Sequence, residues 1–179
     1  MPNVTSFSGI YDLPAGRGHR FASNHFADTF LGGWALNAIV SLQSGMPVTV
    51  TQATNNNSFA GFALQRPNIV AKTSLSPGDR TPAHFFNTDA FETAPKFTIG
   101  NASRNPVRGP AYRDLDLALV KHIHLPGETS AEFRGEVFNV TNTPAFSQPN
   151  GSFGSAAFGS ITSTTTEQRV VQFALRLRK

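Results

Sequence analysis

The sequence predicts an all-β chain of antiparallel, up-and-down strands joined by loops of very unequal length. Five segments alternate apolar and polar residues with a period of two, as strands do when their two faces meet different surroundings. The composition agrees, because 16 Phe residues and only 15% charged residues accompany many Asn, Ser and Thr. Such a composition favours strands and loops over helices.

The first two predicted strands cover residues 4–12 and 33–51. The first alternates weakly and the second clearly, with one interruption at Gly45. A glycine inside a strand pattern often marks a bulge, so we expect one there. Between the two strands, a turn sequence is followed by a stretch that allows one short helix, with Ser23 or Asn24 as its N-cap.

The remaining strands are predicted near 112–125, 129–140 and 168–178, and each has an apolar and a polar face. Lys121 is the one break in the alternation of the third strand. The apolar face comprises Leu115, Leu117, Leu119, Phe133, Val137, Phe173, Leu175 and Leu177. The polar face comprises Asp114, Asp116, His122, His124, Glu132, Arg134, Glu136 and Arg176.

The connections divide into a short and a long class. If successive strands run in opposite directions, the connections 13–32 and 126–128 fall on one side of the sheet, and the long loops 52–111 and 141–167 fall on the other. Short periplasmic turns and long extracellular loops are typical of outer-membrane β-barrels. We therefore expect about five strands of a partial barrel, with the apolar face toward lipid and the polar face toward the lumen.

Composition excludes or disfavours several other functions. With no Cys, the chain has no disulfide, thiol nucleophile or thiolate metal site. The 15 Lys and Arg residues are scattered, so nucleic-acid binding is not expected despite a net charge of +4. No run approaches the length of a transmembrane helix, and no nucleophile motif of a hydrolase occurs. We expect neither enzymatic activity nor a cofactor.

Two groups of polar residues have alternative interpretations. His122 and His124 share one strand face at a spacing that can bind Zn²⁺ or Cu²⁺. Because the sequence fixes no third ligand, the preferred interpretation is that both histidines line the polar lumen, and no metal is expected. A second group is the charged face, which could bind substrate and comprises Glu132, Arg134 and Glu136 beside Asp114, Asp116, Arg176 and Arg178. Pairing of opposite charges across adjacent strands is the preferred interpretation.

The loop 52–111 is the candidate ligand-contacting segment. It is long, it is expected to be extracellular, and its aromatic rings could stack on a ligand. The alternative of equal weight is that these rings pack the loop against itself. The candidate contacts are Phe59, Phe62, Arg66, Phe85, Phe86 and Phe91.

Motifs along nearly the whole chain resemble the C-terminal barrel region of TonB-dependent outer-membrane receptors, most closely the Oar-like subgroup with a carboxypeptidase-regulatory-like domain. No single motif carries the resemblance, which rests on their order. They include Ser8-Gly9-Ile10-Tyr11-Asp12-Leu13-Pro14, Leu31-Gly32-Gly33-Trp34-Ala35-Leu36-Asn37, Leu42-Gln43-Ser44-Gly45-Met46-Pro47-Val48, Arg66-Pro67-Asn68, Phe85-Phe86-Asn87-Thr88-Asp89-Ala90-Phe91, Gly100-Asn101-Ala102-Ser103-Arg104-Asn105 and Phe133-Arg134-Gly135-Glu136-Val137-Phe138-Asn139-Val140-Thr141-Asn142.

The resemblance implies that residues 1–179 are the C-terminal portion of such a receptor, located in the outer membrane. The implied partners are membrane lipid, the plug and other barrel strands of the receptor, an unidentified ligand, and TonB through parts that this chain does not contain. The chain would contribute pore wall and external loops to ligand uptake. The competing class is a soluble all-β module that binds glycan or protein through its loops, and it would bury one sheet face.

Overall fold

The computed structural model describes residues 2–16, 29–54, 65–70, 74–76 and 78–179, and in these residues strands make up nearly all regular structure. Five strands are long: β1 (Val4–Asp12), β2 (Trp34–Gln43), β8 (Tyr112–His124), β9 (Ser130–Phe138) and β11 (Val170–Arg178). The short elements are β3 (Pro47–Val48), β4 (Thr51–Gln52), β5 (Asn68–Ile69), β6 (Phe91–Glu92), β7 (Val107–Arg108), β10 (Ser152–Phe153) and the 3-10 turn η2 (Thr88–Ala90).

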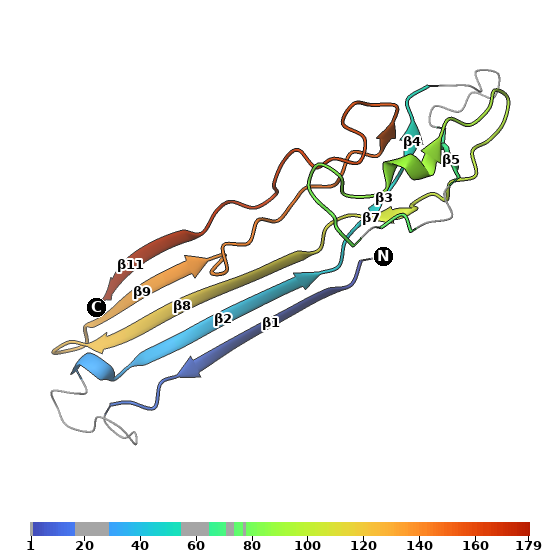
Figure 1. Cartoon of the computed structure of the whole chain (residues 1–179). Helices are drawn as coiled ribbons and strands as arrows, with labels where there is room; N and C mark the ends of the chain where they lie inside the picture. The colour runs from blue at the N-terminus through green and yellow to red at the C-terminus, as the bar shows by residue number, and fades with distance from the viewer. Residues whose placement is uncertain (1, 17–28, 55–64, 71–73, 77) are drawn as a thin grey trace. The chain divides into compact units, whose positions relative to one another are not determined.

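The long strands form one five-stranded sheet in the order β1-β2-β8-β9-β11 (Figure 1). Strand neighbours in the sheet are also successive long strands in the chain, so the all-β, up-and-down fold class is confirmed. The β8–β9 connection is a tight hairpin, in which Leu125 N donates to Thr129 O at 3.1 Å and Gly127 has a φ of 79°. A positive φ costs glycine little, which suits Gly127 to this turn.

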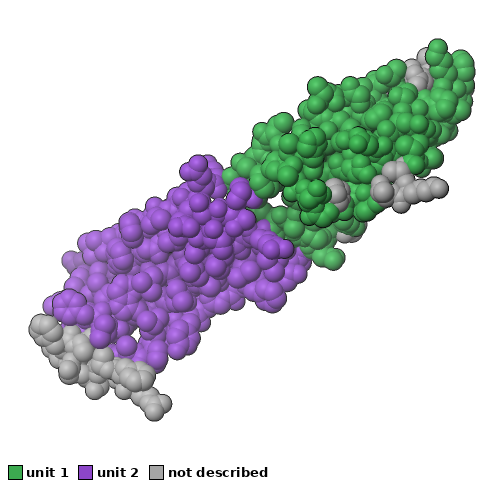
Figure 2. Space-filling view, viewed as in Figure 1, with its two compact units in different colours: residues 1–3, 43–112, 145–166 green, residues 4–42, 113–144, 167–179 purple. Residues whose placement is uncertain are grey.

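The chain divides into two compact units, shown in Figure 2. Unit 2 comprises residues 4–42, 113–144 and 167–179 and contains the five-stranded sheet. Unit 1 comprises residues 1–3, 43–112 and 145–166 and contains three two-stranded sheets: β10-β4, β3-β7 and β5-β6. Within the described part of unit 2, no second sheet covers the first.

The single strand predicted over 33–51 is wrong, because the long strand ends at Gln43. The next residues enter two other sheets: Pro47–Val48 pairs with β7, and Thr51–Gln52 pairs in parallel with β10. Gly45 is therefore not a bulge within one strand. A Cβ on Gly45 would lie 2.0 Å from the carbonyl oxygen of Gly109, so the close approach of two backbones explains this glycine.

The sequence predicted long loops without regular structure at 52–111 and 141–167, and this is wrong in part. The first carries β5, β6 and β7, the second carries β10, and both contribute residues to a buried core. Phe158 contacts Phe86 and Phe91 edge to face, at centroid distances of 5.1 and 5.6 Å. The core cluster is Val48, Val50, Phe85, Phe86, Ala90, Phe91, Val107 and Ile161. Aromatic burial is thus what holds the two loops together in one unit.

Polar side chains, one of them buried, also join distant parts of unit 1. The Gln52 side chain is 7% exposed and donates through Nε2 to Gln65 Oε1 at 3.1 Å, while its Oε1 accepts from Ala94 N at 3.0 Å. Asn101 Oδ1 accepts from Ile69 N at 2.7 Å. The last two contacts supply partners for the backbone N–H groups of Ala94 and Ile69.

The short helix expected before 33–51 lies partly outside the described residues, as do its candidate N-caps Ser23 and Asn24. Residues 29–31 are helical, and the helical segment ends before Gly33, whose φ is 69°. No helix among the described residues is long and apolar enough to span a membrane.

Asn139 directly follows β9, and its side chain makes hydrogen bonds to both ends of the β9–β11 connection. Its φ is 50°, its Oδ1 accepts from Thr143 N at 3.0 Å, and its Nδ2 donates to the carbonyl oxygens of Thr143 and Glu167 at 3.2 and 3.3 Å. Its backbone N–H donates to Asp116 Oδ1 at 2.9 Å. These bonds join the two stems of the β9–β11 connection to each other and to β8.

We expect Asn139→Ala to lower the free energy of unfolding by about 2–3 kcal/mol, since Ala tolerates the left-handed backbone poorly and makes none of the side-chain hydrogen bonds. Asn139→Gly should cost less, because it loses only the hydrogen bonds. Urea unfolding followed by far-UV circular dichroism measures both variants. Equal losses for Ala and Gly would show that backbone strain has no part in the effect.

Candidate functional site

One face of the five-stranded sheet is apolar and exposed. Paired residues of adjacent strands project on the same side, so the register places Leu119, Gly135 and Phe173 in one row and Ile123, Ala131 and Leu177 in another. Every residue of β11 is exposed, and the side chains of Phe173, Leu175 and Leu177 lie on this face with exposures of 73%, 67% and 67%.

All eight residues predicted to face lipid lie at odd positions of β8, β9 and β11, and the register of these strands puts them on this one side. Phe173 stacks on Phe133 with a centroid distance of 6.1 Å and an interplanar angle of 16°. The same ring covers Gly135, where a Cβ would lie 3.3 Å from Phe173 Cε1. The Phe173 ring therefore fills the space that Gly135 leaves in the row of side chains.

Lys121 shares this apolar face, since its register partner is Phe133. Its Nζ donates to Gly32 O at 2.7 Å and to Phe30 O at 3.3 Å, and it lies 5.0 Å from the centre of the Trp34 ring. The Trp34 indole also donates to Phe30 O, at 2.9 Å. Carbonyl oxygens and an aromatic ring thus stabilise the Lys121 ammonium, which interrupts the apolar row of β8.

The opposite face carries charged side chains, and its ion pairs run mainly along one strand. Arg134 lies 3.6 Å from Glu132 and 3.4 Å from Glu136, all three on β9. Across the strands, Glu132 approaches His122 Nδ1 at 3.7 Å and Glu136 accepts a hydrogen bond from Gln172. Of these three ion pairs, only His122–Glu132 crosses between strands as the preferred interpretation predicted, and both arginine pairs lie within β9.

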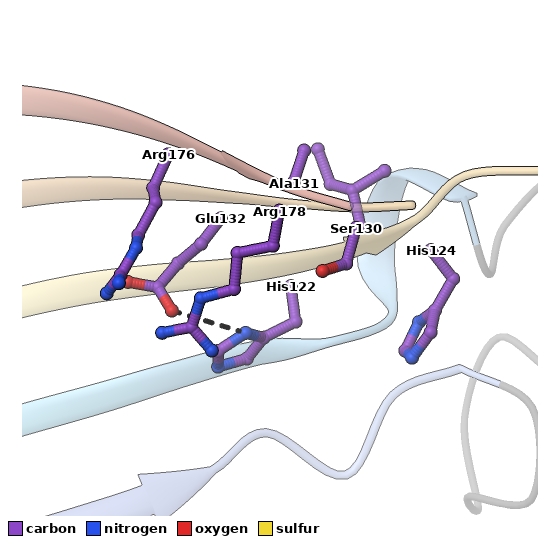
Figure 3. Close-up of a pocket in the computed structure, with 8 residues that line it drawn as sticks. His122, His124, Ser130, Ala131, Glu132, Arg176 and Arg178 are labelled. Atoms are coloured by element: carbon purple, nitrogen blue, oxygen red, sulfur yellow. Dashed lines mark ion pairs between the residues drawn. The ribbon is translucent and has the colours of Figure 1, made fainter. Parts of the chain in front are cut away.

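A hollow of about 360 Å³ lies among polar side chains near the β8–β9 hairpin. The register aligns His122, Glu132 and Arg176 in one row and His124, Ser130 and Arg178 in the next. Figure 3 shows the side chains of Arg176, Glu132, Arg178 and His122 extending to the same side of the sheet, with the His122–Glu132 pair marked. The lining also includes Ile123 and Ala131. This hollow is the candidate site.

The structure separates some of the predicted polar residues from this hollow. Asp116 lies six residues from His122 along β8, or about 20 Å in an extended strand, and its carboxylate accepts from the Asn139 backbone. Asp114 lies farther still. Among the described residues, no three His, Asp or Glu side chains are grouped to hold a metal ion.

The sequence analysis placed Arg178 on the charged face but missed Ser130 as a member of the polar site. Ser130 has an even number in a strand whose even positions are polar, so the alternation that selected Glu132 could have found it. The pairing of Arg178 with Ser130, and of Ser130 with His124, needs the register of both strand pairs.

The predicted ligand contacts in the loop 52–111 lie in different places. Phe85, Phe86 and Phe91 are buried in the core of unit 1, with exposures of 9%, 2% and 5%, which favours the alternative that these rings pack the loop. Arg66 is half-buried. Phe59 and Phe62 lie outside the described residues.

An antiparallel sheet with one exposed apolar face and one polar face is the wall of a membrane β-barrel, whereas a soluble sandwich would bury its apolar face. The chain belongs to the outer membrane beta barrel domain family, whose model matches residues 1–172. This family indicates an outer-membrane location. Neither the curated proteins nor the solved structures include a match to the chain.

Proposed function

We propose that the chain forms part of the barrel wall of a TonB-dependent outer-membrane receptor and serves in the uptake of a ligand, without chemical conversion of it. The observation that carries the barrel role is the apolar face of the five-stranded sheet, exposed opposite a charged face. Family membership and the motifs that resemble these receptors support the receptor role.

The partners follow from the two faces and two edges of the sheet. Lipid covers the apolar face, and the aqueous lumen lies against the face that carries Glu132, Arg134 and Glu136. Strands from the rest of the barrel pair with β1 and β11, which are the edges of the sheet. TonB acts through other segments of the receptor, and unit 1 presents the surface that meets the ligand.

The test compares three isogenic strains: wild type, a strain lacking the gene for this protein, and a strain lacking TonB. Mass spectrometry of spent medium identifies the compounds that each strain fails to take up. Any compound left behind by the receptor mutant should also be left behind by the TonB mutant, because both changes remove the same route. A compound that only the receptor mutant fails to consume would contradict TonB coupling.

A further inference from the structure

We propose that the hollow beside the β8–β9 hairpin binds a water-soluble oxyanion, such as a phosphate or carboxylate group. This binding site is separate from the proposed role in ligand uptake, because it depends only on the side chains of β8, β9 and β11 and does not require coupling to TonB. The residues that carry it are His122, His124, Ser130, Glu132, Arg176 and Arg178.

Charge is the first argument. With both imidazoles neutral, two guanidinium groups and one carboxylate give the hollow a net formal charge of +1, and each protonated histidine adds one more positive charge. The one carboxylate, Glu132, also lies 3.6 Å from Arg134, a cation outside the lining. Arg134 therefore offsets part of the negative charge of Glu132. The electrostatic potential near Arg176 and Arg178 stays positive.

The availability of these arginines is the second argument. Among the residues that the structure describes, neither Arg176 nor Arg178 makes an ion pair or a side-chain hydrogen bond, although Arg176 is the register partner of Glu132. A guanidinium presents its donors in a planar fork that matches the oxygens of phosphate and carboxylate. Two such forks on one strand face, two residues apart, can hold one anion between them.

The neighbouring strands supply further donors. Ser130 and His124 share a row with Arg178, and His122 shares a row with Arg176, so a hydroxyl from β9 and imidazoles from β8 line the hollow beside the two arginines (Figure 3). All lie on the polar face of the sheet. An anion dissolved in water can reach this face, whereas a lipid headgroup approaches from the apolar side.

The experiment is isothermal titration calorimetry of the protein, purified from outer membranes in detergent, with inorganic phosphate as the probe. Arg178→Gln should weaken phosphate binding about tenfold or more, the effect of losing one charge-assisted contact. Arg178→Lys should recover part of the affinity. The matched control is Arg113→Gln, which removes an exposed arginine of β8 outside the hollow and should leave binding unchanged.

Glu132→Gln gives a result that misfolding cannot imitate, because removal of the one carboxylate in the lining should tighten phosphate binding. Weaker binding by Glu132→Gln, equal losses in Arg178→Gln and Arg113→Gln, or no phosphate binding by the unmodified protein would each overturn the proposal. A second titration uses micelles containing phosphatidylglycerol. Binding of that lipid without binding of inorganic phosphate would overturn the assignment to a soluble anion.

Discussion

Phe86→Ala should destabilise unit 1 by about 3–5 kcal/mol, the largest effect that we expect from a single substitution in this chain. Phe86 is 2% exposed, and its ring contacts Phe91 and Phe158 edge to face. Removing it leaves a cavity among aromatic rings that come from both long connections. Because this core holds those connections together, its loss should open them to proteolysis.

Limited proteolysis of the detergent-purified protein measures this effect, with mass spectrometry to locate the cleavage sites. Ile99→Ala is the control, since Ile99 is an apolar residue of unit 1 with 70% of its surface exposed. Cleavage of the Phe86 variant should rise within 74–112 and 145–166, while the control keeps the native pattern. Identical patterns in the two variants would show that the aromatic cluster does not hold unit 1 together.

Leu175→Arg should lower the stability of the barrel by about 2–4 kcal/mol if this position lies near the bilayer midplane, because a guanidinium would then replace an apolar side chain that faces hydrocarbon. Leu175 is 67% exposed and lies in the row with Phe133 and Lys121. Leu117→Arg, on β8, should act in the same direction. Urea unfolding in phospholipid vesicles, followed by the fluorescence of Trp34, the one Trp in the chain, gives the free energies.

The matched control for these variants is Gln172→Arg. Gln172 lies on the same strand but on the polar face, where its register partner is Glu136, so a new arginine gains a carboxylate neighbour. Its stability should change little. Equal tolerance of arginine at positions 172 and 175 would contradict the assignment of the two faces to lumen and lipid.

The sheet was predictable because alternation is a local signal. β1 spans the predicted 4–12, and β8 at Tyr112–His124 lies within one residue of the predicted range. Strand order also followed from the sequence, since each long strand pairs with the next long strand along the chain. Assigning the even residues of β8, β9 and β11 to one face was enough to select most of the polar site.

Unit 1 was not predictable in the same way, because its order comes from contacts between distant residues. A two-residue strand such as Pro47–Val48 is too short to show a period, and its partner lies at Val107–Arg108. The burial of Phe86 likewise depends on Phe158, which lies on the other long connection. Single-sequence patterns therefore gave long loops where the chain has a packed core.

Because of the hydrogen bonds at Asn139, the stability of the sheet depends little on the length of the β9–β11 connection. Its side chain fixes both ends of that connection, at Thr143 and Glu167, and Arg169 N donates to Asn142 Oδ1 at 3.2 Å. Each doubling of a flexible loop costs only about 0.6 kcal/mol of closure entropy. With both stems held by these hydrogen bonds, the segment between them can gain or lose residues during evolution while the strands keep their register, so new loop surfaces can arise on an unchanged sheet.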